Sequence, residues 1–258
     1  VFAALMDISP SRLKRKVHVV SNDTLVESPL VVSHLKQSLR EIEDGTAVHD
    51  LPVTVAVTTP DDAQTFWVLL IGKGYPSPNQ QMRWCTDRLK IQPTSRYIRE
   101  QVTANGAAII LLGVRRNESE VRRRRIDSYQ NDADSSLSPH NSLVGAYIYR
   151  PIVDLTTDEV WELLSSFPPA WGGDNSRLVK LYRDAAGGEC PIVLSQEDAP
   201  GCGTNSSRFG CWTCTVVEKD RSLQGFVDSG NVQYAPLIDF RDWLKEIRND
   251  QTLRQSRR

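Results

Sequence analysis

Five cysteines are the residues of this sequence with the clearest capacity for chemistry. Cys211 and Cys214 form a CxxC pair in the stretch RFGCWTCT, and Cys190 and Cys202 precede them. Thiolates in such an array bind zinc or an iron–sulfur cluster, and no histidine that would complete a mixed site lies beyond His140. The odd number of cysteines argues against a framework of disulfides alone. The array therefore predicts a metal site with sulfur ligands.

The fifth cysteine stands in a cationic stretch. Cys85 lies in RWCTDRLKIQP, close to Arg88 and Lys90. Neighbouring cations favour the thiolate, which is the form that binds metals and acts as a nucleophile. So much nearby charge disfavours a purely structural buried cysteine. The stretch predicts a metal ligand or a nucleophile at Cys85.

Polar segments follow three of the predicted strands. They are SNDTLVE after VHVV, GVRRNESEVR after AIILL, and RPIVD after AYIY. Each alone would pass for an ordinary loop, and the RRRR run at 122–125 is equally typical of a solvated face. Ligands of open α/β sheets bind at the carboxyl ends of strands, so the three segments together predict a nucleotide or phosphate cleft. Asp23 and Glu27 would hold ribose hydroxyls or a metal, and Arg115, Arg116 and Arg122 would clamp phosphates.

Alternating elements must position these residues. Strand-like runs occupy 17–20, 53–57, 107–114 and 146–152, and helical patterns follow the first at 31–42 and precede the third at 94–104. This alternation predicts an α/β fold, with a parallel sheet and helices on both faces. VFAALM at the start reads as helix, FWVLLIG (66–72) is ambiguous, and the polar residues 115–142 are expected to form an exposed loop.

The last third of the chain changes character. TTDEVWELLSSF (156–167) predicts a helix opened by a capping box between Thr156 and Glu159. Residues 168–234 are rich in Gly, Pro, Ser and Asp and hold four of the five cysteines, so a metal staple is expected there. PLIDFRDWLKEIRN (236–249) predicts a closing amphipathic helix. We therefore expect a nucleotide-binding α/β domain over 1–167 and a cysteine-rich, cluster-binding lobe with its closing helix over 168–258.

Bulk properties narrow the function classes. The 258 residues carry a net charge of −1, which gives no global attraction to nucleic acid or to an anionic membrane. No apolar run reaches the ~18–20 residues of a membrane span, and the N-terminus lacks the pattern of a secretory signal. The sequence predicts a cytoplasmic protein with no membrane partner.

Seven stretches carry a family resemblance that covers about residues 15 to 250. They are VHVVSNDTLVESPLV, FWVLLIGKGYPSP, RWCTDRLKIQP, LLGVRRNESEVR, PIVDLTTDEVW, GECP and RFGCWTCT. Together they resemble the phosphoadenosine phosphosulfate reductase-like superfamily, and within it the DndC family, the ATP-pyrophosphatase-like proteins of bacterial DNA phosphorothioation. The resemblance implies an adenine nucleotide α-hydrolase-like fold, ATP with Mg²⁺ as substrate, and a [4Fe–4S] cluster.

The resemblance also implies site residues. The expected nucleotide- and phosphate-binding residues are Asp23, Thr24, Arg88, Lys90, Arg115, Arg116, Glu118, Ser119 and Arg122. The expected cluster ligands are Cys85, Cys202, Cys211 and Cys214. In the alternative set Cys190 replaces Cys85, which then serves as a sulfur carrier.

The implied role is a sulfurtransferase step. The protein would receive sulfur mobilised by a cysteine desulfurase and act with other phosphorothioation proteins on DNA. A glycine-rich SGGKDS-type phosphate loop, which opens the family, is absent from the sequence. Either the loop was removed or left out before Val1, which is the interpretation we favour, or this chain does not hydrolyse ATP. A sulfonucleotide reductase or a tRNA thiolase is the alternative within the superfamily, although no ECGLH-like C-terminal cysteine supports a reductase. A non-catalytic, zinc-stapled module that binds DNA or protein is the alternative of another class.

Overall fold

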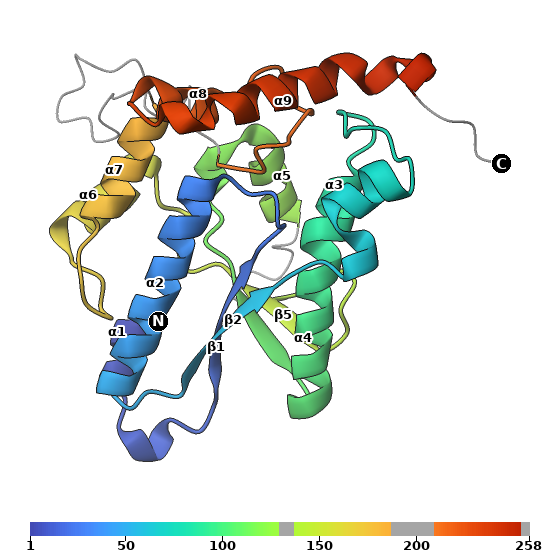
Figure 1. The fold of residues 1–258 in the computed structure, drawn as a ribbon. Coiled ribbons are helices and arrows are strands. Elements are labelled where there is room, and N and C mark those ends of the chain that lie inside the picture. Colours follow the sequence, from blue (N-terminus) through green and yellow to red (C-terminus); the bar gives the residue numbers. More distant parts are fainter. Residues whose placement is uncertain (129–136, 187–208, 254–258) are drawn as a thin grey trace. The chain divides into compact units, whose positions relative to one another are not determined.

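The computed structural model describes residues 1–128, 137–186 and 209–253 (Figure 1). The chain divides into two compact units, the first formed by Val1–Pro93 with Pro168–Arg258 and the second by Thr94–Phe167. The domain boundary expected at 167/168 coincides with the end of the second unit. The first 93 residues belong to the same unit as the cysteine-rich region. The functions assigned to the two expected domains stay predictions.

A β–α–β crossover forms the start of the first unit. Strands β1 (Val17–Asn22) and β2 (Val53–Thr58) pair in parallel, in register from Val17↔Val53 to Asn22↔Thr58, and helix α2 (Pro29–Val48) connects them. Alternate valines suit these strands because β-branched side chains pack well on a pleated surface. Helix α1 (Phe2–Met6), expected from VFAALM, supplies Phe2 to a core of Phe2, Ile42, Leu51 and Val53.

Three helical segments follow one another directly over residues 84–105. They are α3 (Trp84–Thr86), the π-helical turn η4 (Asp87–Ile91) and α4 (Gln92–Asn105). The ambiguous stretch 66–72 forms a second π-helical turn, η3 (Val68–Gly72). Leu89 from η4 and Phe66 before η3 are both buried, and they form one core cluster with Val26. This cluster supports the candidate site.

Three helices close the first unit. They are α7 (Ser176–Ala185), α8 (Arg221–Asp228) and α9 (Ala235–Glu246), and the first two pack around a core of Ala185, Leu223 and Phe226. Short 3₁₀ turns of the two units cover Pro10–Arg12, Asp62–Gln64, Arg116–Glu118, Val232–Tyr234, Ile247–Asn249 and Gln251–Leu253. Within the described ranges, no helix combines the length and the apolar character that crossing a membrane requires.

The second unit holds a three-stranded sheet in the order β3-β5-β4. Strand β3 (Ala108–Leu111) pairs in parallel with β5 (Ala146–Tyr149), and β4 (Leu137–Pro139) pairs antiparallel with β5. Helix α6 (Thr157–Ser166) begins at the predicted capping box, since Thr156 accepts from the Glu159 backbone N–H and Glu159 accepts from that of Thr156. Parallel strands flanked by helices confirm the predicted α/β class.

The exposed loop predicted over residues 115–142 is wrong for its described part. Residues Glu120–Ser128 form helix α5, and β4 follows the gap at 129–136. In this polar helix Glu120 forms ion pairs with Arg123 at 2.8 Å and with Arg124 at 3.0 Å, one turn away, a spacing that favours the helical conformation. The polar composition of this stretch predicted a loop, and the helical spacing of its charged residues was overlooked.

Candidate functional site

The chain makes a tight turn where β1 ends. The backbone N–H of Leu25 donates to Asp23 Oδ1 at 2.8 Å, which closes an Asx turn. Leu25 has a φ of 64°, in the left-handed region that costs a non-glycine residue roughly 1–2 kcal/mol. The turn leaves Leu25 on the surface and directs Thr24, which is 0% exposed, and Val26 inward. Asp23 therefore stabilises the turn, and Thr24 faces the protein interior.

The CxxC segment lies against this turn. Cys211 forms an antiparallel bridge with Glu27, and the Trp212 backbone N–H donates to the Val26 carbonyl oxygen at 3.0 Å. Backbone pairing between segments so far apart in the sequence places the first cysteine of the pair beside the carboxyl end of β1.

Polar groups surround the Cys211 sulfur. Its Sγ lies 3.3 Å from Thr24 Oγ1 and 3.6 Å from Glu27 Oε1, and Thr24 donates to Glu27 Oε1 at 3.0 Å. Lys90 Nζ lies 3.2 Å from the same Glu27 oxygen. Burial, together with the Glu27 carboxylate, raises the pKa of Cys211 to about 12 even though Lys90 opposes the shift. The free cysteine is thus a protonated thiol.

Lys90 reaches the site from η4. Asn22 at the end of β1 donates its Nδ2 hydrogen to the Leu89 carbonyl oxygen at 2.8 Å and ties the π-helical turn to the strand. Turns of this kind occur often at functional sites. Burial by itself lowers the pKa of Lys90, but its interactions with the neighbouring Cys211 and with the Glu27 carboxylate outweigh burial and raise it. Lys90 is therefore a cation directed at the cysteine site.

The other two described cysteines belong to the same region. Cys85 and Cys211 pack against the same core, formed by Val26, Phe66 and Leu89. Burial raises the pKa of the Cys85 thiol, and the neighbouring Cys214 raises it further, which is the opposite of the direction expected from nearby cations. The Cys214 backbone N–H donates to the Cys211 carbonyl oxygen at 3.0 Å. The structure thus brings together three of the predicted sulfur ligands, while Cys190 and Cys202 lie outside the described residues.

The donor chemistry of this region fits an iron–sulfur cluster, which is held by thiolates. Thr213, between the two cysteines of the pair, is buried, and its hydroxyl has no hydrogen-bond partner among the residues that the structure describes. A buried hydroxyl without a partner costs about 1–3 kcal/mol, so an acceptor such as the sulfur of a bound cluster would stabilise it. In residues 1–128, 137–186 and 209–253, however, no three His, Cys, Asp or Glu side chains form a metal-binding group by themselves.

Arg241 is a residue of this region that the sequence reasoning missed. Its side chain is 0% exposed, and it donates from Nε to the Cys214 carbonyl oxygen at 2.8 Å and from Nη1 to that of Glu218 at 2.9 Å. The signal was present, because Arg241 stands at helical spacing between Leu237 and Leu244 on the apolar face of α9. An arginine in such a stripe predicts a buried guanidinium that binds backbone carbonyls.

The predicted phosphate-binding residues after β3 lie in the second unit, whereas the cysteines lie in the first. Arg115 contacts Thr157 Oγ1 at 3.1 Å and Glu118 Oε1 at 3.6 Å. Arg116 contacts the carboxylates of Asp127, at 3.0 Å, and Asp154. Ser119 is the C-cap of the 3₁₀ turn Arg116–Glu118. The Arg122 side chain is not among those that the structure describes. Their contacts within the unit hold these arginines in place.

The remaining predicted residue, Arg88, lies on the surface. Its side chain is partly exposed and lies 3.5 Å from the Asp87 carboxylate. Of the predicted nucleotide residues, the structure therefore places Thr24 and Lys90 beside the cysteines and Asp23 in the adjoining turn.

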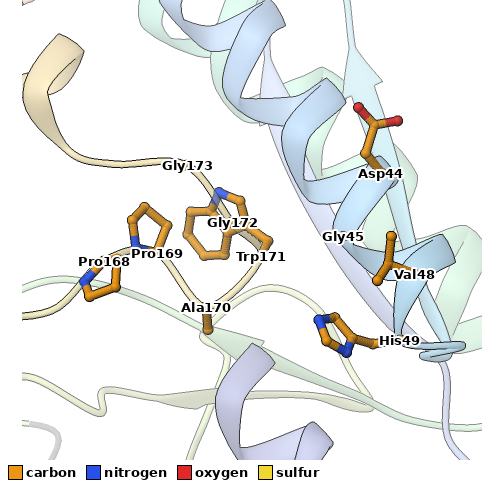
Figure 2. Close-up of a pocket in the computed structure, with 10 residues that line it drawn as sticks. All are labelled: Asp44, Gly45, Val48, His49, Pro168, Pro169, Ala170, Trp171, Gly172 and Gly173. Carbon is orange, nitrogen blue, oxygen red and sulfur yellow. The ribbon is translucent and has the colours of Figure 1, made fainter.

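A separate pocket of about 480 Å³ lies at the other end of α2 (Figure 2). Its lining comes from the last turn of α2 and from residues 168–173, and the Trp171 backbone lies against the helix. The approach is close, because a Cβ on Gly45 would lie 2.5 Å from the Trp171 carbonyl oxygen. The pocket stands where β2 begins, whereas ligands of parallel sheets bind at the carboxyl ends of strands. It is therefore distinct from the candidate site.

Comparison with known proteins gives one finding. The model of the phosphoadenosine phosphosulfate reductase domain matches residues 11–217. The match includes the turn after β1, the Cys85 segment, the arginines after β3 and the CxxC pair. No curated protein matches the chain.

Proposed function

Because the chain belongs to the phosphoadenosine phosphosulfate reductase family, we propose that it is an ATP-dependent sulfurtransferase component of DNA phosphorothioation, as in the DndC family. The family relates the chain to sulfur-related nucleotide chemistry. The finer assignment is supported by the stretches RWCTDRLKIQP and RFGCWTCT, which resemble that family in particular. A cysteine desulfurase, other phosphorothioation proteins and DNA are its proposed partners.

One observation carries the proposal: the Cys211 sulfur lies 3.3 Å from Thr24 Oγ1, beside the carboxyl end of β1. In this fold class that end of the strand faces the ligand cleft. A metal site that only stabilised an irregular lobe would not need to lie beside the carboxyl end of this strand. The position supports a site in which sulfur chemistry and nucleotide chemistry are neighbours.

The proposed reaction has two displacements. An oxygen of a DNA backbone phosphate attacks the α-phosphorus of Mg²⁺-ATP, the bond to pyrophosphate breaks, and pyrophosphate leaves with its electron pair. Sulfur at the oxidation level of hydrosulfide then attacks the activated DNA phosphorus, AMP leaves, and the sulfur loses its proton. In this scheme Lys90 and Glu27 of the first unit orient the cysteine site. The role in stabilising phosphate charge is proposed for Arg115 and Arg116 within the second unit. A bound cluster would supply electron-transfer chemistry and join the cysteine segments.

Single substitutions of each cysteine by serine test the ligand set. The protein is purified without oxygen, and iron, acid-labile sulfide, zinc and the absorbance near about 400 nm are measured. We expect iron and sulfide in the unchanged protein and a marked loss in the Cys85, Cys202, Cys211 and Cys214 variants. The Cys190 variant is the matched control and should retain the cluster. A full cluster in the Cys85→Ser protein would instead favour the set with Cys190.

Metal analysis and product analysis separate the other functions. Zinc without iron or sulfide would favour a non-catalytic stapled module. Sulfite release from phosphoadenosine phosphosulfate would identify a reductase, and thiolated tRNA would identify a thiolase. Phosphorothioate that persists in cellular DNA after Asp23 and Arg115 are both replaced by alanine would contradict the proposed role.

A further inference from the structure

Four aromatic rings from three separate segments meet beside α9. Phe240 lies 6.0 Å from Trp67, 6.1 Å from Trp212 and 5.3 Å from Trp243, measured between ring centroids. Trp67 and Trp212 lie 6.0 Å apart. Such offset and edge contacts make one continuous aromatic surface. Trp212 is the residue next to Cys211, so this surface begins at the candidate site.

Part of this surface is open to solvent. Phe240 is 40% exposed and Trp243 is 47% exposed, although each would stabilise the fold more if it were buried. Large aromatic side chains that cluster on a surface are typical of protein-binding hot spots. The exposed area therefore indicates a docking surface.

The charges beside the rings determine what docks there. The solvent face of α9 carries the acidic residues Asp239, Asp242 and Glu246, all exposed, on either side of the two exposed rings. Its two cations, Arg241 and Lys245, are directed at residues 214–218, where both donate to carbonyl oxygens and Lys245 pairs with the Glu218 carboxylate. Arg241 also forms an ion pair with Asp242, so the negative charge of the face rests mainly on Asp239 and Glu246. The solvent face of this helix is thus aromatic and negative.

We propose that Trp67, Trp212, Phe240 and Trp243, with Asp239, Asp242 and Glu246, form an aromatic–acidic face that binds a segment of a partner protein. The segment presents arginine beside apolar side chains, as an amphipathic basic helix does. Its guanidinium groups stack on the exposed rings and pair with the carboxylates, while its apolar side chains cover the aromatic surface. A nucleic acid does not fit this face, because its phosphates would meet three carboxylates. The contact with Trp212 places the partner beside the cysteine loop.

The test uses the intrinsic fluorescence of the full chain, since three of the rings are tryptophans. The probes are an amphipathic helical peptide of leucine and arginine, about 14 residues or four turns long, and the same peptide with glutamate in place of arginine. A single-stranded oligonucleotide is the third probe. We expect saturable quenching by the arginine peptide, with an affinity at least about tenfold above that of the glutamate peptide or the oligonucleotide.

Variants locate the effect on the face. We expect two variants to bind the arginine peptide at least about tenfold more weakly: Trp243→Ala, and the double charge reversal Asp239→Lys with Glu246→Lys. The charge reversal should also improve binding of the glutamate peptide. The matched control reverses two exposed acids elsewhere, Glu43→Lys with Glu162→Lys, and should bind as the unchanged protein does. All of these positions are exposed, so the variants should fold. Equal binding of both peptides, an effect of the control reversal, or preferential binding of the oligonucleotide would overturn the proposal.

Discussion

The side chain of Arg241 donates a hydrogen bond from Nε to the carbonyl oxygen of Cys214, 2.8 Å away and 27 residues earlier in the chain. This contact ties α9 to the second cysteine of the CxxC pair. Arg248 lies in the 3₁₀ turn that follows α9 and donates to the Thr215 carbonyl oxygen at 3.1 Å. Thr215 Oγ1 in turn donates to the Pro78 carbonyl oxygen at 2.6 Å. The cysteine loop therefore depends on the closing helix for its shape.

Replacement of Arg241 by methionine should destabilise the protein by about 3 kcal/mol, because the carbonyl oxygens of Cys214, Val217 and Glu218 lose a fully buried charged donor. Urea unfolding measures the change. Arg40→Met removes an exposed arginine of α2 and should stay within about 0.5 kcal/mol of the unchanged protein. Equal effects of the two substitutions would show that the buried guanidinium does not hold the loop.

Thr24→Val should lower the free energy of unfolding by about 1–2 kcal/mol, even with no nucleotide present. The substitution keeps the shape of a fully buried side chain but removes the hydroxyl that contacts Glu27 and Cys211. Thr24→Ser keeps the hydroxyl and should therefore lower the free energy of unfolding by less. Thr54→Val removes an exposed hydroxyl from β2 and serves as the control. A Thr24 that acts only as a nucleotide contact would show no loss in the free protein.

Leu25→Gly should be more stable than Leu25→Ala by about 1 kcal/mol, because only glycine adopts a φ of 64° without strain. Leu163 in α6 is also about half exposed and gives the matched comparison. There the order should reverse, since glycine in a helix costs about 1 kcal/mol relative to alanine. Thermal and urea unfolding of the four variants check the prediction. Alanine proving the better residue at both positions would contradict it.

Asp220 predicts a pH-dependent effect. It caps α8 by accepting from the Leu223 backbone N–H at 2.9 Å, and burial raises its pKa although that N–H and Arg241 lower it. The folded pKa lies above the unfolded value of about 3.9, so the stability linked to this group is fully present below the unfolded pKa. It is lost as the pH rises through the folded pKa. Asp220→Asn keeps a neutral cap and should therefore gain stability over the unchanged protein as the pH rises from about 3.5 to about 7.

Urea unfolding of both proteins at several pH values measures that difference. Asp220→Ala is the control for the cap itself and should lose about 1 kcal/mol of stability at low pH, where the native carboxyl is neutral. A difference between the Asn variant and the unchanged protein that stays constant over this range, or falls, would contradict the prediction.

Local patterns in the sequence determined most elements of the fold. The alternating β-branched runs at 17–20 and 53–57 became β1 and β2, and the Thr156–Glu159 capping box opened α6 as predicted. These signals act between residues a few positions apart, where backbone sterics and helix capping determine the outcome. The loop predicted from the polar composition of residues 115–142 was wrong at α5, because it did not take into account the helical spacing of Glu120 with Arg123 and Arg124.

Cysteine types and spacing likewise indicated sulfur chemistry at Cys85, Cys211 and Cys214. Only the tertiary structure decided what surrounds them. The Thr24 hydroxyl lies against the Cys211 sulfur, next to the left-handed Leu25, and α9 supplies a buried arginine to the Cys214 loop. The nucleotide role of Thr24 stays a prediction. Burial and contacts between distant segments follow from how the whole chain packs. The helical spacing of Arg241 with Leu237 and Leu244 indicates its burial, but no local pattern says that its partner is the Cys214 loop.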